Sequence, residues 1–140
     1  MTATLDPAPT PGARLPDLVV TPTSRQLVRY AAATNDFYEA HYDLEFARAA
    51  GLPGVISHGL FKLALFGRAV TAWAGPDCFV REVSATYRGL DLVNEPFRVE
   101  AEVTEATTED GLLVVTLEVR RISARGDRTT LGGAVVDVPA

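Results

Sequence analysis

Apolar and polar side chains alternate along much of the second half of the chain. Over residues 97–103 every second side chain is apolar, and residues 113–120 repeat the pattern. Residues 79–88 and 130–138 have the same strand-like composition, and turns rich in Gly, Asn and Asp separate the four segments. A period of two with one polar face is typical of an antiparallel sheet that has one face on the core and the other exposed to solvent. The pattern therefore predicts an antiparallel meander of four strands.

The longest apolar segment of the first half predicts a buried helix over residues 57–74. Ser57 is its expected N-cap, and Gly75 with Pro76 ends it. Apolar side chains cover most of its circumference, so we expect this helix to be buried on nearly all sides. Three shorter elements, bounded by caps or turns, are predicted before it: a strand at residues 18–20, a helix at 23–33 capped by Thr23, and a helix at 44–50 capped by Asp43.

The order of these elements indicates one α+β domain. One long apolar helix followed by a meander can bury the helix only if the sheet wraps around it. This arrangement suggests the hot-dog fold, an antiparallel sheet wrapped around a long apolar central helix. Residues 17–140 are assigned to this single domain. Residues 1–16, rich in Pro, Ala and Thr, are expected to form a flexible N-terminal arm.

Composition narrows the classes of function. Eighteen acidic residues against 13 basic ones give a net charge of −5, and no basic stripe is present, which argues against a nucleic-acid surface. No apolar run is long enough to span a membrane and the N-terminus lacks a secretory signal, so a cytoplasmic protein is expected. The single cysteine, Cys78, cannot form an internal disulfide, which agrees with a reducing compartment.

A carboxylate and an imidazole lie five residues apart in a stretch too irregular for a helix or strand. Asp36 and His41 could together hold a water molecule, remove its proton and return a proton to a substrate. Histidine is the residue type that most often serves as a general acid or base. The alternative is an aspartate that satisfies loop N–H groups and a surface histidine, because this spacing often occurs by coincidence.

The second histidine and the glycine after it stand at the predicted start of the long helix. A helix N-terminus offers free N–H groups and the positive end of its dipole, which can stabilise a thioester oxygen as it becomes an enolate. Gly59 has no side chain, so a ligand carbonyl could reach its N–H; the alternative is a small residue required for packing. His58 is interpreted first as a capping or packing residue and second as a substrate-binding one.

Two motifs in this order resemble those of the MaoC-like dehydratases. They are Tyr30-Ala31-Ala32-Ala33-Thr34-Asn35-Asp36-Phe37 with His41-Tyr42-Asp43, and Gly54-Val55-Ile56-Ser57-His58-Gly59-Leu60. The family includes (R)-specific enoyl-CoA hydratases and hydroxyacyl-thioester dehydratase subunits, and the resemblance runs from Leu18 to the C-terminus. It implies that Asp36 and His41 activate a water molecule and that the Gly59 N–H binds the developing oxyanion.

The loop between the implied catalytic residues departs from the family pattern, which is commonly Gly-Asp-x-Asn-Pro-apolar-His. Asn35 replaces the glycine, Tyr38 the asparagine, Glu39 the proline and Ala40 a larger apolar residue. Tyr38 is therefore expected to bind substrate and to change where the acyl group lies, rather than the type of reaction. Gly67 stands where some (R)-hydratases carry a hydroxyl group near the catalytic aspartate.

The resemblance implies an (R)-type enoyl-thioester hydratase or 3-hydroxyacyl-thioester dehydratase acting on acyl-CoA or acyl-carrier-protein substrates in fatty acid or lipid metabolism. No metal and no cofactor are expected. Because hot-dog proteins form dimers, we expect a homodimer or a heterodimer with another hot-dog chain, without nucleic-acid or membrane partners. Two alternatives stay open: a subunit of a heteromeric hydratase with little activity alone, and a hot-dog acyl-CoA thioesterase. Fatty, branched and sterol side-chain acyl groups all remain open.

Overall fold

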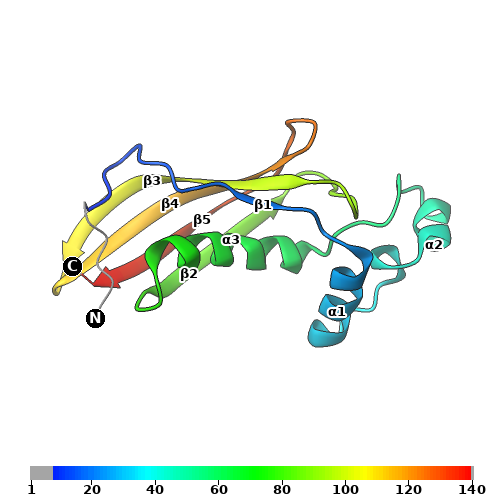
Figure 1. The fold of residues 1–140 in the computed structure, drawn as a ribbon, viewed down its shortest axis with the longest axis horizontal. Coiled ribbons are helices and arrows are strands. Elements are labelled where there is room, and N and C mark those ends of the chain that lie inside the picture. The colour runs from blue at the N-terminus through cyan, green and yellow to red at the C-terminus, as the bar shows by residue number, and fades with distance from the viewer. Residues whose placement is uncertain (1–7, 140) are drawn as a thin grey trace.

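The computed structural model describes residues 8–139 of the chain. Five antiparallel strands curl along one side of a long helix, and the shorter helices gather beyond one end of the sheet (Figure 1). In chain order the elements are β1 (Leu18–Val20), α1 (Ser24–Thr34), the 3-10 helix η1 (Glu39–His41), α2 (Leu44–Ala49), α3 (Gly59–Ala74), β2 (Phe79–Tyr87), β3 (Phe97–Glu109), β4 (Leu112–Ser123) and β5 (Arg128–Pro139). The predicted α+β arrangement, a sheet wrapped around one long helix, is confirmed.

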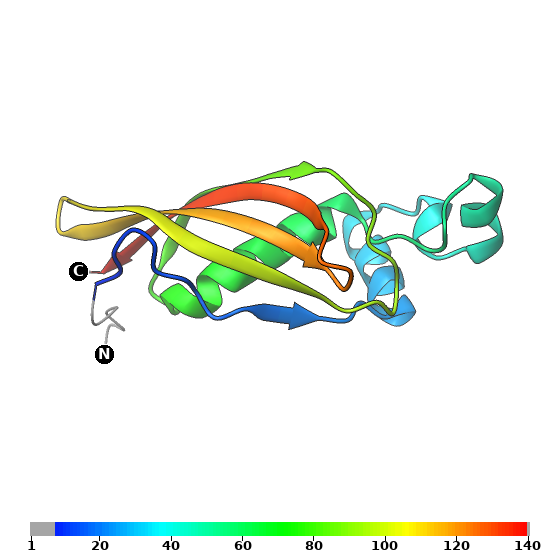
Figure 2. The same cartoon turned by 90° about the horizontal axis from the view of Figure 1, so that it is seen from above.

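The sheet order is β1-β3-β4-β5-β2, so the predicted four-strand meander holds for β3, β4 and β5 only. The prediction is wrong for β2, which pairs with β5 at the far edge of the sheet, with Ser84 opposite Gly133 and Tyr87 opposite Thr130. Figure 2 shows β1 and β2 along opposite edges, with α3 between them. Residues 88–96 then cross from one edge to the other. Alternation of side chains identifies a strand but not its partner.

The core lies between the concave face of the sheet and α3. The inward side chains of β3 are those that the alternation predicted, with Val99 and Val103 each 1% exposed. They meet Leu65, Phe66 and Val70 of α3 in one apolar cluster. A fully buried side chain of this size contributes about 1.5–3 kcal/mol, so this layer fixes the position of α3 on the sheet.

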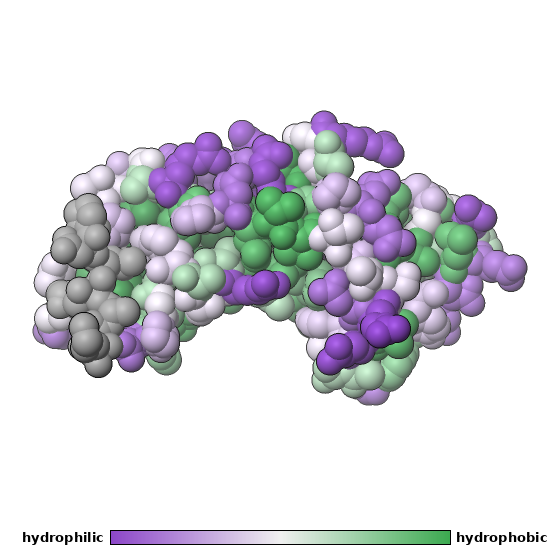
Figure 3. All heavy atoms as spheres, viewed as in Figure 1, coloured by the Kyte–Doolittle hydropathy of each residue, from purple (hydrophilic) through white to green (hydrophobic). Residues whose placement is uncertain are grey.

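One face of α3 is exposed in the single chain, contrary to the expectation of burial on nearly all sides. Its exposed side chains recur every three or four residues and are Leu60, Ala64, Arg68, Thr71 and Ala72. Leu60 is 57% exposed. The space-filling view in Figure 3 shows the molecule hollowed along its lower side, beneath the sheet and its central helix. A helix face that exposes a leucine and two alanines beside a hollow is a surface that a partner could cover.

The helix caps agree with the sequence for α1 and α2. Thr23 and Gln26 form a capping box at α1, and the Asp43 carboxylate accepts the N–H of Phe46 at 2.9 Å. The cap of α3 was predicted one residue too early: His58 is at the N-cap and makes no side-chain capping bond. Ser57 lies before the helix, and its N–H donates to the Asp91 carbonyl at 2.8 Å.

The segment before β1 runs along β3. Gly12 N–H donates to the Val103 carbonyl at 2.8 Å, and Leu15 N–H donates to the Ala101 carbonyl at 3.0 Å. Of the arm expected over residues 1–16, residues 1–7 lie outside the described residues, and the described end is hydrogen bonded to the sheet. Within residues 8–139, no helix has the length and apolar character that a membrane span requires.

Candidate active site

The candidate site lies where the end of α1, η1 and the start of α3 meet. Asn35 ends α1 in the left-handed conformation, with φ of 56°. Asparagine adopts this conformation more readily than most residues, which explains how Asn35 can stand where relatives carry glycine. The Asp36 N–H then donates to the Ala31 carbonyl at 3.0 Å, which turns the chain away from the helix axis.

Asp36, His41 and His58 come together, with their potential ligand atoms all within 4.8 Å of one another. His41 Nδ1 lies 2.8 Å from the Ile56 carbonyl oxygen. Because a carbonyl only accepts, this contact places the proton on Nδ1 and leaves the lone pair of Nε2 free. The predicted carboxylate–imidazole pair therefore has an imidazole nitrogen available to act as a base.

His58 is fully buried behind this pair. Its Nε2 lies 3.2 Å from the Asp36 carbonyl oxygen, and its ring stacks on the ring of His41 with centroids 3.8 Å apart. Burial lowers the pKa of His58 below its ordinary value, and the neighbouring His41 lowers that pKa further. A neutral ring in this place supports both the Asp36 backbone and the His41 ring.

The three side chains are also the residue types of a metal centre, but their orientation fits one poorly. Metal ions bind imidazole along an in-plane lone pair. The His41 and His58 rings are stacked, with planes inclined by only 26°, so their in-plane lone pairs lie in nearly parallel planes, which is unfavourable for converging on one ion. One nitrogen of each ring is already hydrogen bonded to a backbone carbonyl.

Gly59 begins α3, and no side chain caps this helix start. The first N–H groups of a helix have no partner within it, so they can donate to a substrate oxygen. A Cβ at residue 59 would lie 3.1 Å from Cζ of Tyr87, whose ring packs against the glycine. The structure thus gives a packing reason for glycine here, alongside the predicted oxyanion role.

Tyr38 lies at the outer side of His41. Its ring meets the His41 ring edge-on, with centroids 5.7 Å apart, and meets Phe46 in the same way at 5.6 Å. Half of the Tyr38 side chain is exposed. It stands beside the candidate base, as expected of a residue that shapes the substrate pocket; its binding role stays a prediction.

Two tyrosines near the site were not assigned a role from the sequence. The Tyr30 ring contacts the His58 ring at 5.1 Å between centroids, and Tyr87 covers Gly59. Burial raises the pKa of both phenols, so both keep their hydroxyl protons at neutral pH. The position of Tyr30 in the first motif could have indicated it. The sequence around Tyr87 gives no comparable signal, because the position of Tyr87 beside Gly59 depends on the pairing of β2 with β5.

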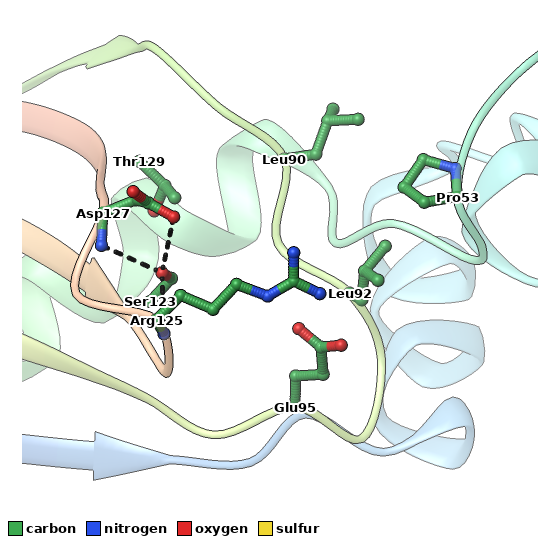
Figure 4. A pocket seen from close by; sticks show the side chains of 8 residues that line it. All are labelled: Pro53, Leu90, Leu92, Glu95, Ser123, Arg125, Asp127 and Thr129. Atoms are coloured by element: carbon green, nitrogen blue, oxygen red, sulfur yellow. Dashed lines mark hydrogen bonds between the residues drawn. The ribbon is translucent and has the colours of Figure 1, made fainter.

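A cavity of about 130 Å³ lies beside the segment after β2 and is lined in part by Leu90, Leu92 and Glu95 (Figure 4). Arg125 extends across it toward Glu95, between Thr129 on one side and Pro53 on the other. Asp36, His41 and Gly59 do not line this cavity. It is therefore separate from the candidate catalytic residues.

The chain resembles known proteins over most of its length. The MaoC like domain model matches residues 8–124. Among curated proteins, the chain is 26% identical over 133 residues to the fatty acid synthase beta subunit TOXC of Cochliobolus carbonum, spanning 94% of this chain but only 6% of that protein.

Solved structures share the fold of this chain. A chain of the ChsH1-ChsH2 complex from Mycobacterium tuberculosis is 26% identical, with a TM-score of 0.81 over 92% of this chain and 98% of that one. The (R)-hydratase from A. caviae involved in PHA biosynthesis shares the fold, with 23% identity and a TM-score of 0.87 over 95% of this chain and 99% of that one. Since the family model covers most of the chain, this protein belongs to the MaoC-like dehydratase family.

Proposed function

We propose that this chain is an (R)-type enoyl-thioester hydratase or 3-hydroxyacyl-thioester dehydratase. The observation that carries the proposal is the 2.8 Å contact of His41 Nδ1 with the Ile56 carbonyl, which leaves Nε2 free on a ring that has a nitrogen within 4.8 Å of the Asp36 carboxylate. A carboxylate and a neutral imidazole on one water molecule are the groups that general acid–base chemistry needs. The uncapped start of α3 adds donors for a thioester oxygen.

In the hydration direction, Asp36 and His41 hold a water molecule beside Cβ of the enoyl thioester. One of them removes a proton as the water oxygen forms a bond to Cβ. The electrons of the C=C bond move toward the thioester, whose oxygen is stabilised as an enolate by the Gly59 N–H. A proton then adds to Cα, which gives the 3-hydroxyacyl thioester. Dehydration follows the same steps in reverse.

The proposed ligand is a thioester of coenzyme A or of an acyl carrier protein. Both present the same reacting group, so the site residues serve either carrier. The curated relative is a fatty acid synthase subunit, which supports a place in fatty acid or lipid metabolism. We infer that His58, being buried, supports Asp36 and His41 from behind and that Tyr38 is the residue beside the acyl group.

We also propose that the chain works as a dimer, with itself or with another hot-dog chain. The exposed face of α3 and the free edge of β2 support this assembly. A second candidate function is a subunit that has little activity alone. One similar structure favours it, because the matched chain belongs to a complex of two differently named proteins, ChsH1 and ChsH2. The rebuilt Tyr38–Ala40 loop supports it as well.

The test is a panel of trans-2-enoyl-CoA thioesters incubated with the purified chain. Loss of enoyl absorbance without release of free thiol is the expected result. Release of thiol would show a thioesterase instead and would overturn the proposal. No hydration of any chain length by the purified chain, with activity appearing only after a second hot-dog chain is added, would favour the subunit role.

A further inference from the structure

A cluster of charged side chains is buried in the core next to the start of α3. Lys62 Nζ lies 2.6 Å and Arg121 Nη1 2.8 Å from the same oxygen of Asp91. The other Asp91 oxygen accepts a hydrogen bond from Thr129 Oγ1 at 2.8 Å. The side chains of Asp91 and Lys62 are each 4% exposed and that of Arg121 is 0% exposed.

The cluster holds two cations against one carboxylate. Among the described residues, Arg121 Nε and Nη2 have no hydrogen-bond partner, and the Arg121 guanidinium lies 3.2 Å from the centroid of the Phe97 ring. Burial lowers the pKa of Arg121 to about 10. Buried ion pairs of this kind often stabilise a fold less than apolar side chains of similar volume would. Stability alone therefore does not account for this cluster.

Asp91 lies within residues 88–95. This stretch is hydrogen bonded to residues 55–57, which come directly before α3. Its carbonyl accepts the Ser57 N–H at 2.8 Å, and Val93 N–H donates to the Val55 carbonyl at 3.0 Å. Ile56 and Leu92 form an antiparallel bridge between the two segments. Residues 55–57 are therefore hydrogen bonded to residues 91–93, the segment that contains the buried Asp91 carboxylate.

The segment of residues 55–57 is also hydrogen bonded to the 3-10 helix η1, which carries the candidate base His41. The Ile56 carbonyl accepts the proton of His41 Nδ1 at 2.8 Å, and the Ile56 N–H donates to the Ala40 carbonyl at 3.1 Å. Both bonds fix η1, which carries His41. The orientation of the imidazole therefore depends on where Ile56 lies.

Lys62 connects the cluster to the other half of the site. Its ammonium donates to the Gly89 carbonyl at 2.9 Å and lies 5.9 Å from the centroid of the Tyr87 ring. That ring packs on Gly59, where the proposed oxyanion donor lies. The cluster therefore contacts both segments that bear the proposed chemistry.

We propose that Asp91 is a positioning residue for His41: by anchoring residues 88–95 to α3, β4 and β5, it fixes the Ile56 carbonyl that sets the tautomer of the imidazole. This role rests on the proposed function as far as catalysis is concerned. The structural part, from Asp91 through Ser57 and Ile56 to His41, can be tested without any substrate.

The primary variant is Asp91→Asn, which keeps the shape of the side chain but removes its charge. Glu100→Gln is the matched control, since Glu100 is also a buried carboxylate between two cations, with 8% of the residue exposed against 6% for Asp91. It is held by Arg98 at 2.6 Å and Arg120 at 3.0 Å. Two readouts are used on folded protein. They are kcat with KM for an enoyl-CoA, and the tautomer of His41 from its imidazole ¹⁵N shifts, which are tractable because the chain has only two histidines.

We expect Asp91→Asn to lower kcat about 10- to 100-fold, as small misplacements of a catalytic group do, with KM changing less than about twofold. The Nδ1–H tautomer of His41 should lose population. Glu100→Gln should leave kcat and the tautomer as in wild type, whatever its effect on melting temperature. An Asp91→Asn protein with wild-type kcat and tautomer, or equal losses in the control, would overturn the proposal.

If Asp91→Asn does not fold, Lys62→Met takes its place, because it removes the 2.6 Å ion pair that ties Asp91 to α3. Arg121 and Thr129 still pair the carboxylate, so this variant should fold. A smaller change of the same kind, about 10-fold in kcat with a measurable tautomer shift, is expected. Unchanged values would contradict the proposal. If the wild-type chain hydrates no thioester, the proposed function fails, and the ¹⁵N comparison still decides whether Asp91 positions His41.

Discussion

At the scale of single residues, the proposed chemistry depends on the Asp36 carboxylate and the free Nε2 of His41. Asp36→Asn keeps the size of the side chain but removes the carboxylate that we propose holds and polarises water, and His41→Ala removes the proposed base. Each should lower kcat/KM for hydration at least about 100-fold, in line with the loss of a general acid–base group. Steady-state assays on folded variants measure this.

Asp43→Asn is the matched control for that experiment. Asp43 is a carboxylate of the same loop region that caps α2 through the Phe46 N–H, and asparagine caps a helix about as well. We expect its activity to stay within about twofold of wild type. Near-normal activity of Asp36→Asn, with the control also normal, would show that another group activates the water.

His58 should make the stability of the fold depend on pH. Burial holds the pKa of His58 below its ordinary value of 6.5. As the pH falls below 6.5, the unfolded chain takes up a proton that the folded chain resists, so the free energy of unfolding decreases until the folded pKa is reached. His58→Gln cannot titrate. Urea unfolding between about pH 7.5 and about pH 5.5 should therefore show a steeper loss in wild type than in the variant; equal slopes would contradict this.

Tyr38 should influence which acyl group is preferred. Its half-exposed ring stands against His41 and Phe46, so replacement by the smaller side chain in Tyr38→Asn opens space beside the base. A pocket change of one or two methylenes is worth about 1–3 kcal/mol of discrimination. The measurement is the ratio of kcat/KM for a short and a bulky enoyl-CoA. If both values change by the same factor, Tyr38 serves the chemistry or the fold.

At the scale of elements, the pairing of β5 with β2 requires glycine at one position. A Cβ on Gly132 would lie 1.9 Å from the backbone oxygen of Ser84, which cannot move without breaking the strand pair. Gly132→Ala should lower the free energy of unfolding by about 1–3 kcal/mol or more. Gly54→Ala is the control, because its nearest neighbour would be 3.9 Å away. Equal unfolding midpoints for the two variants would show that β2 shifts freely.

The sequence predicted where helices and strands lie along the chain better than it predicted which of them pack or pair together. The caps Thr23 and Asp43 and the alternation around Val99 are local signals, and all of them appear in the structure. The place of β2 beside β5, the contact of Tyr87 with Gly59, and the ion pair of Lys62 with Asp91 join segments far apart in the chain. No periodicity encodes such contacts.

In the candidate site too, local motifs could be read from the sequence and long-range contacts could not. Asp36, His41 and Gly59 could be singled out because two short motifs carry them, and the structure brings Asp36 and His41 together at the α3 end. The hydrogen bond that assigns the His41 tautomer comes from Ile56, fifteen residues away. A backbone carbonyl leaves no signal in the residue type, so this support could be found only from the structure.

At the scale of the whole molecule, the single chain leaves an apolar surface uncovered. Leu60 of α3 is 57% exposed and Phe79 of β2 is 66% exposed. Within the described sheet, β2 is an edge strand, and an open edge next to an apolar helix face favours association. The exposed face of α3 also begins at Leu60, next to Gly59, so a partner seated there would lie beside the candidate active site.

We therefore expect a stable dimer at micromolar concentration, with an interface of roughly 2,000 Å² or more. Ala64→Glu places a charge in the middle of the exposed α3 face without disturbing the core, because Ala64 is exposed in the single chain. It should shift sedimentation toward the monomer and lower hydratase activity together. Ala32→Glu, at an exposed position of α1, should leave both unchanged. A wild-type chain that sediments as a fully active monomer would show that the hollow beside α3 does not seat a partner.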